Sequence, residues 1–134
     1  MTMNTFIKNR DYLISSRKRC NNHRRRILDI SQKVRALHAG GAFSALEIVD
    51  TIYYRLMKKN YKKKFVDTFL MSKGHGCMSQ YVVLESLGIF PKNYLDTYCT
   101  KNGKLGCHPD YGIPGIEAST GSLGHGMGLA VGMA

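Results

Sequence analysis

The sequence predicts an α/β fold with a parallel sheet and a helix-rich N-terminal part. Two amphipathic helical patterns come first, over roughly residues 23–38 and 45–56. Two short runs rich in strand-forming residues follow, at 65–71 and 116–120, with further helical patterns between them. Helices that alternate with strands favour a layered architecture with parallel strands, in which ligands bind at the carboxyl ends of the strands.

The first two helices have recognisable limits. Apolar residues at spacings of three and four define the first helix: Ile27, Ile30, Val34 and Leu37. The glycine pair at 40–41 is expected to end it. Ser44 and Glu47 have the spacing of a capping box, which predicts that the second helix starts near Ala45.

The remaining segments complete the expected organisation. Residues 1–22 are polar, basic and weakly periodic, and we expect an irregular or loosely helical lead-in to a domain formed by 23–134. A third helix is expected over roughly 77–87, ending at Gly88. A fourth should have Pro91 in its first turn, where proline costs no hydrogen bond.

Composition limits the possible classes of protein. A chain of 134 residues is long enough for one domain. It contains no apolar run of eighteen residues, so we expect no membrane span. It has no secretory signal either, and we therefore expect a cytoplasmic protein. The four cysteines are far apart, which favours reduced thiols over a disulfide framework. Cys77, Cys99 and Cys107 with His108 could surround a metal ion, but their spacing fits no standard ligand pattern.

Positive charge is concentrated in the first half of the chain. The net charge is +11, and residues 1–64 hold 16 of the 20 lysines and arginines. The densest run is Lys58–Lys64, for which a solvated helix end is the simplest interpretation. A nucleic-acid-binding module is the alternative, because clustered cations bind phosphate backbones. No aromatic-interleaved strand or known nucleic-acid motif accompanies the charge, so a nucleic-acid-binding module is less favoured than a solvated helix end.

Three histidines lie in glycine-containing loops. They are His38, His75 and His108. A histidine beside glycine can approach a ligand closely and move a proton near neutral pH, although an ordinary hydrogen-bonded histidine is the alternative at each position. If the strands are parallel, the three loops should meet at one edge of the sheet. A fourth glycine-rich segment, Glu117–Gly128, predicts a turn and a helix start that serve either ligand binding or close packing.

Taken together, these segments resemble successive motifs of the thiamine-diphosphate-binding N-terminal region of transketolases. The resemblance covers roughly residues 24–134 and is closest to bacterial transketolases whose two halves are separate chains. The motifs that carry it, in order, are His38–Glu47, Met71–Gly76, Gly106–Asp110, Pro114–Gly126 and Ala130–Ala134. Each motif is short, and the ordered set is what makes the resemblance specific.

The resemblance implies a partial three-layer thiamine-diphosphate-binding fold. It also implies a transferase that moves a two-carbon ketol unit between sugar phosphates, using thiamine diphosphate with Mg²⁺. His75 matches the family histidine that reaches the diphosphate. Gly121, Ser122 and Leu123 match the cofactor-binding turn, in which the first and last of these residues pack on the aminopyrimidine ring.

The resemblance further implies catalytic roles for two histidines. His38 and His108 match family histidines that face the substrate hydroxyls and assist proton transfer. Two positions depart from the family: Ser122 stands where many transketolases have proline, and His125 where many have glutamine. These departures leave the expected cofactor unchanged and affect the expectation about substrate choice.

The motifs that bind the metal are missing from this sequence. The family holds Mg²⁺ with a Gly-Asp-Gly motif and a later Asn, and no Gly-Asp-Gly occurs here. The glutamate that activates the aminopyrimidine belongs to the other half of the family's catalytic unit. We therefore expect an N-terminal fragment or subunit, inactive alone, whose partner is a C-terminal transketolase half or a second copy. A non-catalytic remnant that binds a partner through the apolar helix after Gly126 is a further alternative.

Overall fold

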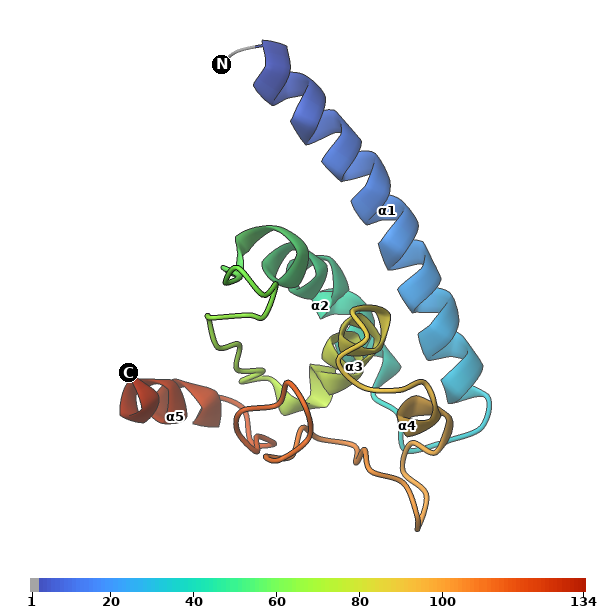
Figure 1. The fold of residues 1–134 in the computed structure, drawn as a ribbon. Helices are drawn as coiled ribbons and strands as arrows, with labels where there is room; N and C mark the ends of the chain where they lie inside the picture. The colour runs from blue at the N-terminus through green and yellow to red at the C-terminus, as the bar shows by residue number, and fades with distance from the viewer. Residues whose placement is uncertain (1–2) are drawn as a thin grey trace.

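The computed structural model describes residues 3–134 of the chain, with side chains from Asp11 onward; residues 1 and 2 of the expected lead-in lie outside the described residues. Three long helices pack against one another, and two shorter ones lie along the loops of the second half (Figure 1). The elements are α1 (Met3–Ser31), α2 (Ala39–Thr51), the π-helical turn η1 (Ile52–Leu56), the 3₁₀ turn η2 (Gly74–Gly76), α3 (Cys77–Ser86), α4 (Asn93–Asp96) and α5 (His125–Met133).

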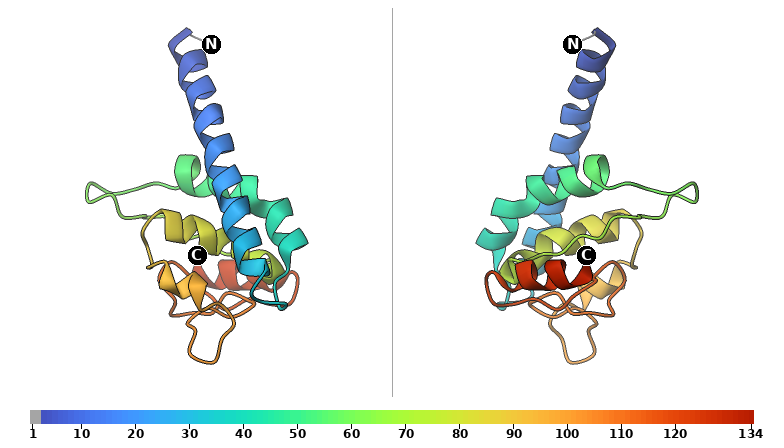
Figure 2. Two further views of the ribbon diagram at one scale, coloured as in Figure 1. Left: turned by 90° about the vertical axis from the view of Figure 1, so that its right-hand side faces the viewer. Right: turned by 90° about the vertical axis from the view of Figure 1, so that its left-hand side faces the viewer.

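Helix α1 is one continuous helix of 29 residues. Its buried stripe has helical spacing and consists of Cys20, His23, Ile27 and Ile30. Of the two forms expected for the lead-in, irregular or loosely helical, residues 3–22 have the helical one and continue into the rest of α1 without a break. Their first half projects away from the other helices (Figures 1 and 2). The helix ends at Ser31, earlier than the apolar spacing predicts, because Val34 and Leu37 pack against the core from the following loop.

Helix α2 begins at Ala39, six residues before the position predicted from the capping box. The Ser44 hydroxyl donates to the carbonyl oxygen of Gly41 at 3.0 Å, so it caps no helix. The expected glycine break is in fact the first turn of α2. Glycine suits this turn despite its low helix propensity, because the backbone of η2 lies close to Gly41 and leaves little room for a side chain.

The predicted parallel sheet is absent from residues 3–134, which contain no strand and one isolated antiparallel bridge between Lys59 and Phe65. Segments 65–71 and 116–120 belong to no strand, and they do not form a ladder with each other. They meet at their ends, where the Thr120 hydroxyl donates to the carbonyl oxygen of Met71 at 2.6 Å. A strand needs a neighbouring strand for its backbone hydrogen bonds, and neither segment has one among the described residues.

Helices α3 and α4 lie close to their predicted positions, α3 from Cys77 to Ser86 and α4 starting two residues after Pro91. Helix α3 is the most buried element, and its residues 77–84 are all buried. It forms the centre of the core, against which α1 and α2 pack.

Helix α5 exposes apolar side chains, as its sequence predicts. Its exposed residues are Met127, Leu129, Val131 and Met133. Among residues 3–134, no helix combines the length and the apolar character that crossing a membrane requires.

Buried His23 on α1 gives a testable pH dependence. Burial lowers the pKa of His23 below its ordinary value of 6.5, against the attraction of Asp50 and with some repulsion from Arg19. Below about pH 6.5, His23 is therefore protonated in the unfolded chain but stays neutral in the folded chain until the pH reaches its lowered pKa. The free energy of unfolding should be highest above that pH and fall as the pH drops through the lowered pKa.

Urea unfolding between about pH 7.5 and 5.5 measures this effect. His23→Gln should flatten the dependence of the free energy of unfolding on pH. His125→Gln, at the exposed start of α5, should leave it unchanged. Equal pH dependence in wild type and His23→Gln would refute the assignment to His23.

Candidate functional site

The structure brings the three loop histidines together. His38 precedes α2, His75 lies in η2, and His108 lies in the loop between α4 and α5. The ring centroids are 4.8 Å apart for His38 and His75, 4.7 Å for His75 and His108, and 5.8 Å for His38 and His108. The expected meeting of these loops therefore occurs, although no sheet edge organises it.

Close backbone contacts at two glycines hold the loops together. A Cβ atom at Gly41 would lie 3.0 Å from the carbonyl oxygen of His75, so the first turn of α2 rests directly on η2. A Cβ atom at Gly74 would lie 2.7 Å from the carbonyl oxygen of Thr120 and 2.9 Å from the Cα of Gly121. At Gly74 any side chain would overlap backbone atoms, and at Gly41 a Cβ atom would make a tight contact that only a shift of the η2 backbone could relieve.

Helix α3 fixes the loop that carries His108. The Tyr81 hydroxyl donates to the carbonyl oxygen of His108 at 2.8 Å, and the Cys77 thiol donates to that of Cys107 at 3.3 Å. Burial raises the pKa of Tyr81 and raises that of Cys77 to about 12, so both side chains keep the protons they donate. In addition, the Cys107 sulfur lies 3.5 Å from Nδ1 of His108.

Two nitrogens of the histidine cluster are buried without a partner. Nδ1 of His75 and Nε2 of His108 have no hydrogen-bond partner among the described residues. A buried polar atom that lacks a partner costs free energy, on the order of 1–3 kcal/mol. These nitrogens fit a polar ligand, since an imidazole nitrogen can donate to or accept from it, depending on the tautomer.

The turn before α5 is only partly in contact with the histidines. Gly121 packs on His108, because a Cβ atom at Gly121 would lie 3.8 Å from the His108 ring. Ser122 and Leu123 face solvent, and Leu123 is 71% exposed. The turn thus lines one side of the cluster with backbone and presents an apolar side chain beside it.

Sequence reasoning missed the residues that position the site. Tyr81 was not singled out, and Cys77 was considered only as a reduced thiol or a possible metal ligand, but their spacing of four on an apolar helix could have marked a shared polar contact. Lys73 was also missed; its ammonium donates to the Ser44 hydroxyl at 3.1 Å and ties η2 to α2. No signal in the sequence identifies that pairing.

Metal ligands do not assemble in the part of the chain that the structure describes. It contains no group of three or more His, Cys, Asp or Glu side chains that could hold a metal ion. The alternative metal site around Cys77, Cys99, Cys107 and His108 is therefore not formed.

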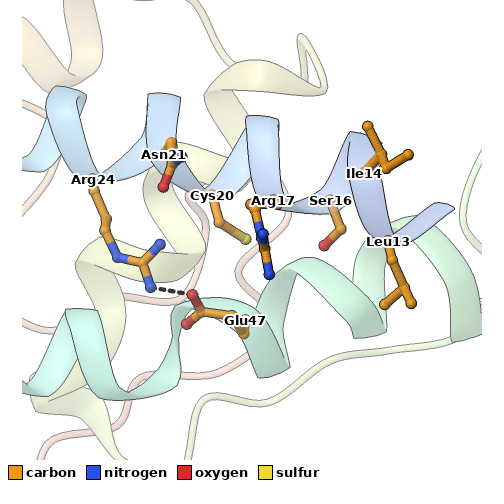
Figure 3. A pocket seen from close by; sticks show the side chains of 8 residues that line it. All are labelled: Leu13, Ile14, Ser16, Arg17, Cys20, Asn21, Arg24 and Glu47. Atoms are coloured by element: carbon orange, nitrogen blue, oxygen red, sulfur yellow. Dashed lines mark hydrogen bonds and ion pairs between the residues drawn. The ribbon is translucent and has the colours of Figure 1, made fainter. Parts of the chain in front are cut away.

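A separate groove lies between α1 and α2, with a volume of about 780 Å³ (Figure 3). Its lining residues are Leu13, Ile14, Ser16, Arg17, Cys20, Asn21, Arg24 and Glu47. Arg24 and Glu47 form an ion pair across it, and it contains no histidine. The chemistry therefore points to the histidine cluster rather than to this groove.

Comparisons with known proteins agree with the resemblance to transketolases. Residues 15–134 match the family described as "Transketolase, thiamine diphosphate binding domain". The chain belongs to this transketolase family.

Individual relatives define the extent of the similarity. An apulose-4-phosphate transketolase subunit of Phocaeicola vulgatus is 38% identical over 115 residues, which are 84% of this chain and 41% of that protein. The transketolase of Aquifex aeolicus is 37% identical over 112 residues, 80% of this chain and 16% of that protein. The structure of transketolase from Leishmania mexicana superposes with a TM-score of 0.77 at 30% identity, covering 88% of this chain and 18% of that one. The chain thus spans about two fifths or less of each of these relatives.

Proposed function

We propose that this chain supplies one part of a thiamine diphosphate site in an enzyme that transfers two-carbon ketol units between sugar phosphates. The observation that carries the proposal is the cluster of His38, His75 and His108, with two buried ring nitrogens that lack partners. When bound, the cofactor supplies the carbon chemistry, and the protein supplies position and electrostatics.

Each part of the site has a proposed role. His75 would hydrogen-bond the diphosphate, at the start of α3 where backbone N–H groups also favour an anion. Gly121, Ser122 and Leu123 would form the wall for the aminopyrimidine ring; the exposed Leu123 supports this role because it offers apolar surface beside the cluster.

His38 and His108 would bind substrate hydroxyls and move protons. Imidazole is suited to both tasks near neutral pH. The hydrogen bonds from Tyr81 and Cys77 to the 107–108 backbone would keep the His108 ring in place during that exchange.

We further propose that the site is incomplete in this chain. The sequence contains no Gly-Asp-Gly motif, so Mg²⁺ ligands would come from another segment of protein. The partner would be a C-terminal transketolase half or a second copy. Relatives whose names describe them as transketolase subunits support a separate partner chain. The proposed location is the cytoplasm.

Thermal unfolding with and without ligand tests this proposal. For the chain alone we expect a dissociation constant on the order of 1 mM for thiamine diphosphate, about −4 kcal/mol of binding free energy. At 10 mM ligand with Mg²⁺, the free energy of unfolding should then rise by about 1.4 kcal/mol. The expected increase in Tm is roughly 3–5 °C.

Two histidine variants provide the comparison. His75→Ala should lose this increase in Tm, whereas His125→Ala should retain it because His125 lies exposed on α5 outside the cluster. An equal increase in both variants would indicate non-specific binding of the anion to this basic chain and would refute the assigned site. A dissociation constant in the micromolar range for the chain alone would refute its proposed incompleteness.

A further inference from the structure

A lysine-rich hairpin, residues 58–66, follows η1 and projects from the body of the protein (Figure 2). Its two arms are joined by the bridge between Lys59 and Phe65 and by the bond from the Val66 N–H to the carbonyl oxygen of Lys58 at 2.9 Å. At the tip, the side-chain oxygen of Asn60 accepts from the backbone N–H groups of Lys62 and Lys64 at 3.0 Å each. The hairpin is therefore ordered by its own hydrogen bonds.

The base of the hairpin is attached to the core. The Phe65 ring contacts the buried Tyr53 ring edge to face, with centroids 5.5 Å apart. The Lys59 ammonium lies 4.5 Å from the centroid of Phe65. A fixed base and a hydrogen-bonded tip mean that binding costs little backbone conformational entropy in the hairpin.

The outer side chains combine cations with one exposed aromatic ring. The hairpin carries five lysines, and residues 51–66 contain no acidic residue. Tyr61 at the tip is 89% exposed, and the Lys62 ammonium lies 5.5 Å from the centroid of its ring. The carboxylate of Asp67 beside the hairpin accepts a hydrogen bond from the backbone N–H of Lys58.

We propose that the lysine-rich hairpin binds single-stranded nucleic acid, with its lysines on phosphates and Tyr61 stacked on a base. An unpaired base offers a flat π-face on which the exposed Tyr61 ring can stack. The phosphate backbone offers negative charge for the lysines. A duplex hides the faces of its bases, and an anionic vesicle offers only charge. The sequence already has Tyr61 within the lysine run but no aromatic-interleaved strand; the structure adds that this ring is exposed at the tip of an ordered hairpin.

This surface is distinct from the proposed cofactor site. The histidine cluster lies at the start of α2, and the hairpin begins after the end of η1. Helix α2 and η1 separate them along the chain, and the 13 residues of α2 alone span about 20 Å at 1.5 Å per residue. The two functions can therefore fail separately in experiments.

Fluorescence anisotropy with a labelled 20-nucleotide oligothymidylate tests the proposal on the full chain at several salt concentrations. Tyr61→Ala should weaken binding by about 10-fold, while Tyr61→Phe should retain it, because stacking needs only the ring. Replacing Lys62, Lys63 and Lys64 together by glutamine should make the slope of log K against log salt less steep by about 2.

A triple variant on α1 serves as the charge-matched control. Replacing the exposed residues Arg17, Lys18 and Arg25 by glutamine removes the same charge outside the hairpin. It should change the salt slope by less than the hairpin variant does. The proposal is wrong if the two triple variants weaken binding equally, if duplex DNA binds as tightly as the single strand, or if vesicles containing phosphatidylserine bind while the oligonucleotide does not.

Discussion

Gly74→Ala is expected to abolish the stabilisation by thiamine diphosphate and to lower the free energy of unfolding by about 1–3 kcal/mol. The added Cβ would lie 2.7 Å from the carbonyl oxygen of Thr120 and 2.9 Å from the Cα of Gly121. Both are backbone atoms, so η2 must move away from this segment and carry His75 with it. Urea unfolding and the change in Tm with ligand measure the two effects.

Gly128→Ala is the matched control for this variant. A Cβ atom there meets no atom within 4 Å, and the residue lies within α5. Because alanine favours a helix over glycine, the free energy of unfolding should stay equal or rise by up to about 1 kcal/mol. The ligand-induced increase in Tm should persist. Equal losses for both glycine variants would show that close packing at Gly74 does not hold the site together.

Asp50→Ala is expected to give the largest loss of stability, about 3–5 kcal/mol. The Asp50 side chain is fully buried and accepts hydrogen bonds from Arg19 Nε and Nη2 at 2.9 Å each and from the Ser16 hydroxyl at 2.7 Å. Its removal leaves the half-buried guanidinium of Arg19 without its counter-ion. The measurement is the midpoint and slope of urea unfolding.

Glu47→Ala provides the comparison on the same helix pair. Glu47 pairs with Arg24 between α1 and α2, as Asp50 pairs with Arg19, but the side chains of Glu47 and Arg24 are both substantially exposed. Exposed ion pairs contribute little, so the expected loss is below about 1 kcal/mol. Losses of similar size in the two variants would contradict the importance assigned to burial of Asp50.

The three histidines of the candidate site could be singled out from the sequence because each lies in a local pattern. Each histidine lies in a short segment that contains glycine, and the order of the motifs suggested one shared site. The physical reason for their meeting was not predictable. It depends on contacts between distant segments, such as the backbone at Gly41 and Gly74 and the hydrogen bond from Tyr81 to the His108 loop.

The fold was predicted less completely, for the same reason. Helix α3 followed from local pattern, and its limits were nearly right. The predicted start of α2 was wrong because Gly41 packs on the backbone of η2. That contact joins segments distant in sequence, so local sequence patterns do not reveal it. Segments 65–71 and 116–120 have the composition of strands, but a strand also depends on a neighbour, and composition carries no information about that neighbour.

Histidine NMR tests the central claim most directly, namely that the histidine cluster receives thiamine diphosphate. The chain is labelled with ¹⁵N-histidine, its signals are assigned with single histidine variants, and the ligand is added with Mg²⁺ to 10 mM. We predict that the ring signals of His75 and His108 shift saturably, while those of buried His23 on α1 stay in place. No saturable shift of either His75 or His108, or equal shifts at all five histidines, would contradict the claim.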